Sequence, residues 1–193
     1  NIWVCEKSAA HQYHRTLKLG GEAAAADLNV NLTDDAPAVS GDADAQLDMF
    51  ATAVAAKPDA ICIGAIDQEA VVATMEQAKE AGIPVFCYDN GVNSDIPITT
   101  LATNDIAATR TLAEKIGAGC GGEGGVLVIG HDQTSKNGVD RTNGFIDALN
   151  ELYPDMEILD VQYSNDAAVV TEIAKSMITT YPDAAGIYGH CDN

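Results

Sequence analysis

The chain has 193 residues, of which 47% are hydrophobic and 5% aromatic, and its formal net charge is −19. This length suits one large domain or two small ones, with a core built mainly of Ala, Val, Ile and Leu. Only ten Lys and Arg residues are present, which excludes a nucleic-acid partner because phosphate binding needs clustered cations. No apolar run has the length of a membrane span.

Short apolar runs alternate with longer amphipathic patterns along the whole chain. Near-continuous apolarity is typical of parallel strands that are buried on both faces. In chain order the expected strands are IWVC (2–5), VNL (30–32), AICIG (60–64), VFCY (85–88), TTLA (99–102), GVLVIG (125–130), EILDVQ (157–162) and AGIYG (185–189). The apolar stripes with helical spacing are Val71, Met75, Ala78 and Ala81; Val139, Phe145, Ile146, Leu149 and Leu152; and Val170, Ile173, Ala174, Met177 and Ile178. This alternation predicts an α/β fold with doubly wound parallel sheets.

Three expected helices end in the same way before a strand. Their stop signals are KPDAICIG (57–64), YPDMEIL (153–159) and YPDAAGIYG (181–189), and proline cannot continue a helix. The helix before VFCY instead ends with Gly82 followed by Pro84. Any α/β chain can reuse good stop signals, but we interpret the recurrence as two similarly built halves. We therefore expect two domains, residues 1–103 and 104–193.

The glycine-rich segment GAGCGGEGG (117–125) superficially resembles a dinucleotide-binding fingerprint. That fingerprint requires its glycines after a strand and before a helix, where backbone N–H groups face the phosphates. Here the glycines follow an expected helix and precede an expected strand. We therefore expect no nucleotide cofactor at this segment.

Polar residues follow most of the expected strands. Since ligands of parallel α/β sheets bind beyond the carboxyl ends of the strands, these segments are the candidate site. They are EKSAAHQYH (6–14), AIDQE (65–69), YDNG (88–91), HDQTSKNGVDR (131–141), YSND (163–166) and HCDN (190–193). Their hydroxyl, amide, carboxylate, imidazole and guanidinium groups suit a neutral polyhydroxylated ligand.

Several of these residues have a simpler role at helix starts. Asp67 is typical of the N-cap of a helix that begins at Gln68, and the segment 164–166 also resembles a helix start. Asp42 and Asp44 are favourable acids for a first helical turn.

Metal binding and disulfides are not expected. His11 and His14 have a spacing that a metal could use on a helix, but no third ligand is evident. The five cysteines are odd in number and include no C-x-x-C pair, and four of them fall in or beside apolar runs. We expect no metal and no cofactor.

Asp89 and Arg141 are the two strongest candidates for ligand binding. Asp89 leaves a buried strand where Gly91 already supplies a turn and no clear helix follows for it to cap. Arg141 lies near the start of an expected helix, where a cation opposes the helix dipole, so another role should justify it. A guanidinium that bridges two ring hydroxyls is one such role, and a surface salt bridge to Asp140 or Asp147 is the alternative.

The segments IWVCEKSAAHQYHRTLKLGGEAAAADLNVNL (2–32), AVVATMEQAKEAGIPVFCYDNG (70–91), LATNDIAATRTLAEKI (101–116) and DRTNGFIDALNELYP (140–154) occur in an order that resembles the periplasmic sugar-binding proteins of ABC importers. The ribose- and galactose-type members, with two Rossmann-like lobes, are the most similar. The resemblance covers the whole chain. The same fold also serves as the effector domain of LacI-type transcriptional regulators.

The resemblance assigns candidate ligand-binding residues position by position. They are Tyr13 and His14 as the aromatic pair, Asp89 and Asn90 as the strand-end pair, Arg141 as the helical arginine, Asn165 at the second-lobe aromatic, and His190, Cys191 and Asp192 after the last strand. Asn90, His14 and Asn165 depart from an arginine, a phenylalanine and an aromatic, respectively. These departures imply a pocket more polar than a ribose site.

The resemblance implies a binding protein that captures a sugar or cyclitol between two lobes for an ABC permease in the membrane. We expect no catalysis, because no candidate nucleophile has a credible base beside it. The alternative is the effector-binding domain of a LacI-type regulator. The implied location is periplasmic or extracytoplasmic after signal-peptide removal, with a lipid anchor in a Gram-positive organism. Since the chain stops at HCDN, where a further helix should begin, we expect the second lobe to be incomplete.

Overall fold

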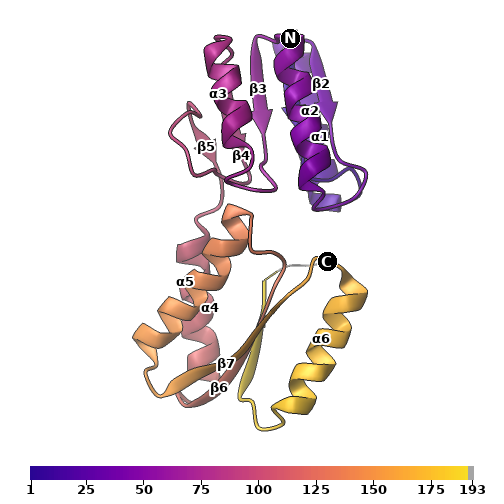
Figure 1. The fold of residues 1–193 in the computed structure, drawn as a ribbon. Helices are drawn as coiled ribbons and strands as arrows, with labels where there is room; N and C mark the ends of the chain where they lie inside the picture. The colour runs from indigo at the N-terminus through magenta and orange to yellow at the C-terminus, as the bar shows by residue number, and fades with distance from the viewer. Residues whose placement is uncertain (191–193) are drawn as a thin grey trace. The chain divides into compact units, whose positions relative to one another are not determined.

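A computed structural model of the protein describes residues 1–190. The described chain forms two compact units, residues 1–103 with 134–136, and residues 104–133 with those from 137 onward. Each unit has its own parallel sheet and its own core (Figure 1).

The first unit contains a five-stranded parallel sheet in the order β2-β1-β3-β4-β5. Its elements in chain order are β1 (Ile2–Cys5), α1 (Gln12–Leu28), β2 (Leu32–Asp35), α2 (Ala43–Ala56), β3 (Ala60–Ile63), α3 (Val72–Glu80), β4 (Val85–Tyr88) and β5 (Thr100–Leu101). Phe50 of α2 and Met75 of α3 are fully buried in one core with Ile61 and Ile63 of the central strand β3. Helices α2 and α3 therefore pack against the same sheet.

The second unit contains a three-stranded parallel sheet in the order β7-β6-β8. Its elements are α4 (Asp105–Gly119), β6 (Gly124–Gly130), α5 (Lys136–Leu152), β7 (Met156–Tyr163), α6 (Ala167–Thr180) and β8 (Gly186–Gly189). Successive residues of β6 point to opposite faces, as strand geometry requires. Val126 and Val128 pack with residues of α4 and α5, whereas Leu127 and Ile129 pack with residues of α6. Helices thus cover both faces of this sheet (Figure 1), and the predicted α/β, doubly wound architecture is confirmed.

The predicted helix ends and the glycine segment also agree with the structure. Helix α2 closes on Lys57, in a left-handed conformation with φ 51°, directly before Pro58. Helix α3 is followed by Gly82, whose φ is 73°. The glycines after α4 precede β6, so they occupy no dinucleotide-binding turn.

Some local predictions were wrong. Strand β2 begins at Leu32 rather than Val30 and continues into Asp34 and Asp35, because the edge strand of the sheet tolerates polar residues. Helix α3 begins at Val72 rather than Gln68, after a turn.

Two residues of the predicted apolar stripes are exposed, Ala81 and Ile178. Ala81 is the C-terminal cap of α3, and Ile178 lies at the edge of the buried stripe of α6 that contains Met177. Within residues 1–190, none of the helices combines the length and apolarity that crossing a membrane requires.

Candidate functional site

In the first unit, a largely buried ion pair joins the ends of two strands. Lys7 follows β1, Asp89 follows β4, and Lys7 Nζ lies 3.4 Å from Asp89 Oδ2. Asp89 has a left-handed backbone with φ 62°, a conformation that Asp and Asn adopt more readily than other L-residues. Its N–H donates to the carbonyl of Leu101. The carboxylate is therefore held at the carboxyl end of the sheet, beside a cation.

Asn90, the next residue, is buried and ties two loops together. Its side-chain amide donates to the carbonyl of Ala65, at 2.9 Å, in the loop after β3. This hydrogen bond joins the loop after β4 to the loop after β3. A direct contact between Asn90 and a ligand stays a prediction.

Tyr13 and His14 lie in the first turn of α1 but have different surroundings. His14 is buried, and its Nδ1 lies 2.9 Å from Glu6 Oε2. Tyr13 is about half exposed, and its ring meets the His14 ring edge-on, with centroids 5.3 Å apart. His11 caps the helix, because its Nδ1 accepts from the N–H of Tyr13. In the part of the chain that the structure describes, no three His, Cys, Asp or Glu side chains form a group that could hold a metal.

Gln46 of α2 is a central residue of this edge that the sequence analysis missed. Its amide nitrogen donates to the carbonyls of Glu6 and Gly64, at 3.0 and 2.8 Å, and its oxygen accepts from the N–H of Ile66, also at 2.8 Å. Gln46 is almost completely buried. It therefore holds the loops after β1 and β3 in place. The sequence did contain a sign of this role, because Gln46 is the polar residue on the side of α2 that also carries the buried residues Phe50 and Ala53.

In the second unit, Arg141 and Asp105 form a partly buried ion pair. Arg141 Nε donates to Asp105 Oδ1 at 2.8 Å, and Nη1 donates to the carbonyl of His190 at 3.4 Å. The alternative role considered for Arg141 was a surface salt bridge to Asp140 or Asp147, and this ion pair reaches Asp105 of α4. Arg141 also lies in the second turn of α5 rather than the first, because the helix begins at Lys136.

His190 follows β8 and lies among other polar groups. Its Nε2 is 3.0 Å from the hydroxyl of Thr142, and its Nδ1 is 3.4 Å from Nδ1 of His131. Burial, with the nearby charges of His131 and Arg141, lowers the pKa of His190 to about 4. The imidazole is therefore neutral near pH 7.

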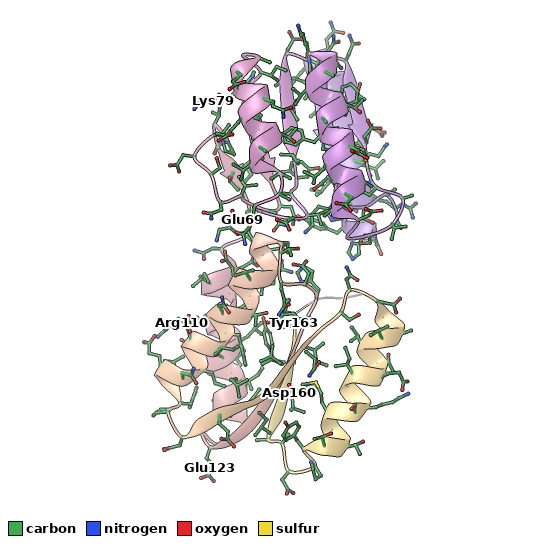
Figure 2. The ribbon with its side chains drawn as sticks, viewed as in Figure 1. Glu69, Lys79, Arg110, Glu123, Asp160 and Tyr163 are labelled. Carbon is green, nitrogen blue, oxygen red and sulfur yellow. The ribbon has the colours of Figure 1, made fainter. Side chains whose placement is uncertain are left out.

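Gly130, at the end of β6, makes room for this ring. A Cβ at Gly130 would lie 2.8 Å from His190 Nε2 and 2.7 Å from the ring of Tyr163 in β7, which is labelled in Figure 2. Such contacts are too short for any larger residue without displacement of the His190 ring.

Arg141 and His190 line a cavity of about 460 Å³ within the second unit. This volume lies in the range of small-molecule pockets. The other lining residues are Asp105, Ala108, Thr109, Leu112, Tyr188 and Gly189. The cavity combines a cation, a carboxylate, an imidazole and apolar groups.

The remaining predicted site residues are less informative. Asn165 is exposed in the loop between β7 and α6, and the adjacent Asp166 caps α6 through the N–H groups of Ala168 and Val169. The structure does not bring Asn165 into the cavity that contains Arg141. Cys191 and Asp192 lie outside the described residues.

The two parallel sheets with polar strand ends agree with the family comparison. The family model for the periplasmic binding protein domain matches residues 2–193. The chain therefore belongs to the periplasmic binding protein family, which is a family of solute-binding proteins rather than enzymes. The resemblance to sugar-binding proteins of ABC importers is confirmed.

Individual relatives agree with this assignment. The chain is 28% identical to a D-apiose import binding protein of Actinobacillus succinogenes, over 64% of this chain and 40% of that protein. It is similar to a solute-binding protein from Agrobacterium vitis with bound D-fucose, with a TM-score of 0.91 and 26% identity over 96% of this chain and 66% of that one. A sugar-binding protein from Bacillus halodurans gives a TM-score of 0.82 and 29% identity, over 98% of this chain and 65% of that one. The chain thus spans less than half the length of its first curated relatives, at 40% and 47%.

Proposed function

We propose that this protein binds a sugar or cyclitol and presents it to an ABC permease in the membrane. The observation that carries the proposal is the 460 Å³ cavity in the second unit, where Arg141 and His190 meet apolar side chains. A planar guanidinium carries five N–H donors in a fork that suits neighbouring hydroxyls, and apolar surface covers the C–H face of a sugar ring. Related binding proteins that carry sugars in their names or structures support this choice of ligand.

We propose the same role for polar residues at the strand ends of the first unit. Asp89 supplies a carboxylate acceptor, and its contact with Lys7 orients it. Tyr13 offers an exposed aromatic face. The resemblance adds His14 and Asn90 in this unit and Asn165, Cys191 and Asp192 in the second. His14 and Asn90 both make buried contacts within the protein, so we propose that they shape the site around Asp89.

The hydroxyl of Thr142 lies beside a possible base, His190, but its position fits binding rather than catalysis. Thr142 contacts His190 Nε2, as a nucleophile would contact its base, but Thr142 is buried with 2% exposure. Thr142 does not line the 460 Å³ cavity, so its hydroxyl does not face a ligand held there. We therefore propose that Thr142 orients the imidazole and that the ligand leaves unchanged.

The proposal includes a location outside the cytoplasm, with removal of a signal peptide and, in a Gram-positive organism, a lipid anchor. The relatives named for import favour this role over that of a LacI-type effector domain. The coding sequence upstream of Asn1 distinguishes the two, since an export signal supports import and a helix-turn-helix domain supports regulation.

A thermal-shift screen tests the proposal. The protein expressed from its complete coding sequence is heated with pentoses, hexoses, deoxy sugars, cyclitols and amino acids. A ligand that binds only the native state raises the melting temperature, and at 100 times Kd it adds about 2.7 kcal/mol to the free energy of unfolding. We expect the shift from a sugar or cyclitol and none from amino acids. Stabilisation by amino acids alone would contradict the proposal.

A further inference from the structure

Four side chains around the carboxyl ends of β6 and β8 make three successive polar contacts, and we call them the imidazole network. His131 Nε2 lies 2.8 Å from Asp132 Oδ2, directly after β6. His131 Nδ1 lies 3.4 Å from Nδ1 of His190, which follows β8, and His190 Nε2 lies 3.0 Å from the hydroxyl of Thr142 in α5. The contact between the two imidazoles is the longest of the three, and their rings meet edge-on with centroids 5.2 Å apart. All four residues belong to the second unit.

The chemistry of each group fixes the direction of these hydrogen bonds when both imidazoles are neutral. An ionised carboxylate only accepts, so the proton of His131 lies on Nε2 and its Nδ1 is an acceptor. His190 then donates from Nδ1, which leaves its Nε2 to accept from the hydroxyl of Thr142. The carboxylate of Asp132 therefore sets the tautomer of His190 through His131.

The charges around the imidazole network favour a cation at one end. The carboxylate of Asp132 stabilises a charged His131, whose side chain is 11% exposed. His190 instead lies beside Arg141, whose Nη1 donates to the His190 carbonyl at 3.4 Å. Burial, with the charges of His131 and Arg141, lowers the pKa of His190 to about 4. A proton added to the two imidazoles should therefore be held as charge on His131.

Three further elements contribute titratable groups nearby. Asp105 of α4 forms its ion pair with Arg141, so this carboxylate is committed to the guanidinium rather than to the imidazoles. Tyr188 of β8 has its ring centroid 5.7 Å from that of His190, and burial raises the pKa of its phenol to about 12, so the phenol carries no charge. Tyr163 supplies a second phenol from the end of β7 (Figure 2). Asp132 is thus the carboxylate that contacts the imidazole pair.

We propose that the imidazole network reverses its direction when it takes up one proton. A proton from solvent binds His190 Nε2, and the proton on His190 Nδ1 moves to His131 Nδ1. His131 then carries two ring protons and the positive charge, whereas His190 stays neutral with its proton on Nε2. The hydroxyl of Thr142 turns from donor to acceptor, and its hydrogen bonds a carbonyl of the preceding helical turn, as threonine hydroxyls in helices do.

This switch goes beyond the proposed sugar-binding function and does not depend on it, because it operates in the protein without a ligand. His190 lines the 460 Å³ cavity together with Arg141. The surroundings of that cavity therefore gain positive charge as the pH falls, while the imidazole that lines it stays neutral.

Nuclear magnetic resonance of the imidazole nitrogens tests the proposal, because the ¹⁵N chemical shift distinguishes a protonated ring nitrogen from an unprotonated one. The protein is expressed from its complete coding sequence with ¹⁵N-labelled histidine, and the signals are assigned with His131→Gln and His190→Gln. At about pH 7.5 we expect protons on His131 Nε2 and His190 Nδ1. On acidification, His131 should gain its second proton at the midpoint at which the His190 proton moves to Nε2. A His190 tautomer that stays unchanged or changes at a different midpoint would overturn the proposal, as would a second proton on His190 before His131.

Variants separate the switch from a structural role of the same residues. Asp132→Asn removes the charge that stabilises a charged His131, so the tautomer change should move to lower pH by about one unit. Asp147→Asn is the matched control, because Asp147 is an exposed carboxylate of α5 in the same unit, and it should leave the midpoint unchanged. In His131→Gln, His190 should keep one tautomer over the pH range in which it changes in the wild type. Equal midpoints in the two aspartate variants, or a persistent tautomer change in His131→Gln, would overturn the proposal.

Discussion

Arg141 and Asp105 join α5 to the start of α4 through an ion pair in which Nε and Oδ1 lie 2.8 Å apart. Asp105 is the first residue of α4, where a carboxylate interacts favourably with the helix dipole, and it is buried. Asp105 therefore stabilises its own helix and positions the guanidinium that lines the cavity of the second unit.

Replacement of Asp105 by alanine should destabilise the protein. Asp105→Ala leaves the partly buried Arg141 without this acceptor, and a hydrogen bond to a charged group contributes about 1.5–3 kcal/mol. Urea denaturation measures the loss. The matched control is Glu151→Ala, because Glu151 and Arg110 form an exposed pair, with Arg110 labelled in Figure 2. An exposed pair contributes less than about 1 kcal/mol, so equal losses in the two variants would contradict the assignment.

Asp89→Asn should weaken sugar affinity and preserve the fold. Asparagine tolerates the left-handed backbone of Asp89 but carries no charge, so it loses the ion pair with Lys7 and the charge-assisted bond that we propose between Asp89 and the ligand. We expect affinity to fall by about tenfold or more in calorimetric titration.

Asp67→Ala is the matched control for Asp89. The Asp67 carboxylate accepts from the N–H groups of Glu69 and Ala70, both at 2.9 Å, so it stabilises the turn ahead of α3, whereas the sequence had predicted that it caps that helix. Its removal should cost about 1 kcal/mol of stability and leave affinity unchanged. If Asp67→Ala loses binding while Asp89→Asn retains it, the ligand binds at the end of β3 rather than at the end of β4.

Gln46→Leu should be the most destabilising of these single substitutions. Leucine keeps the volume but leaves the backbone groups of Glu6, Gly64 and Ile66 without their side-chain partner. Each unsatisfied buried group costs about 1–3 kcal/mol, so the total should exceed 3 kcal/mol, as urea or thermal denaturation would measure. A loss under about 1 kcal/mol would mean that water replaces the amide.

His190 should make stability depend on pH. Its pKa is about 4 in the folded protein and about 6.5 in the unfolded chain, so the unfolded state binds the proton more readily. Its contribution is complete above pH 6.5 and is lost progressively as the pH falls from 6.5 towards 4.

The difference between the wild type and His190→Gln isolates this contribution from the carboxylates. Urea denaturation at pH 7 and pH 5 should show a larger loss at pH 5 in the wild type than in the variant. Equal losses would show that His190 is protonated as readily in the folded protein as in the unfolded chain.

The fold was predictable because the strands carry an unambiguous apolar signal. Ile61 and Ile63 of β3 and Val126 and Val128 of β6 are completely buried, as near-continuous apolar runs suggest. The edge strand β2 was misplaced by two residues because half of it is Asp34 and Asp35, which resemble a loop.

The presence of polar residues at the strand ends was predictable from the sequence, but the partners of these residues were not. The polar residues do follow the strands, as the topology of a parallel sheet requires. The partners of Asp89 and Arg141 are Lys7 and Asp105, which are 82 and 36 positions away in the chain (89 − 7 and 141 − 105). Such pairs depend on loop conformation and helix packing, and residue periodicity carries no information about either.

The most direct test of the central claim is recovery of the bound ligand. The protein is incubated with the sugar that raises its melting temperature most, freed of excess by gel filtration and denatured, and the released molecule is identified and quantified by mass spectrometry. A solute-binding protein should release about one equivalent of the chemically unchanged sugar per chain. Release of a converted product, or retention of none of the sugars, would contradict the account.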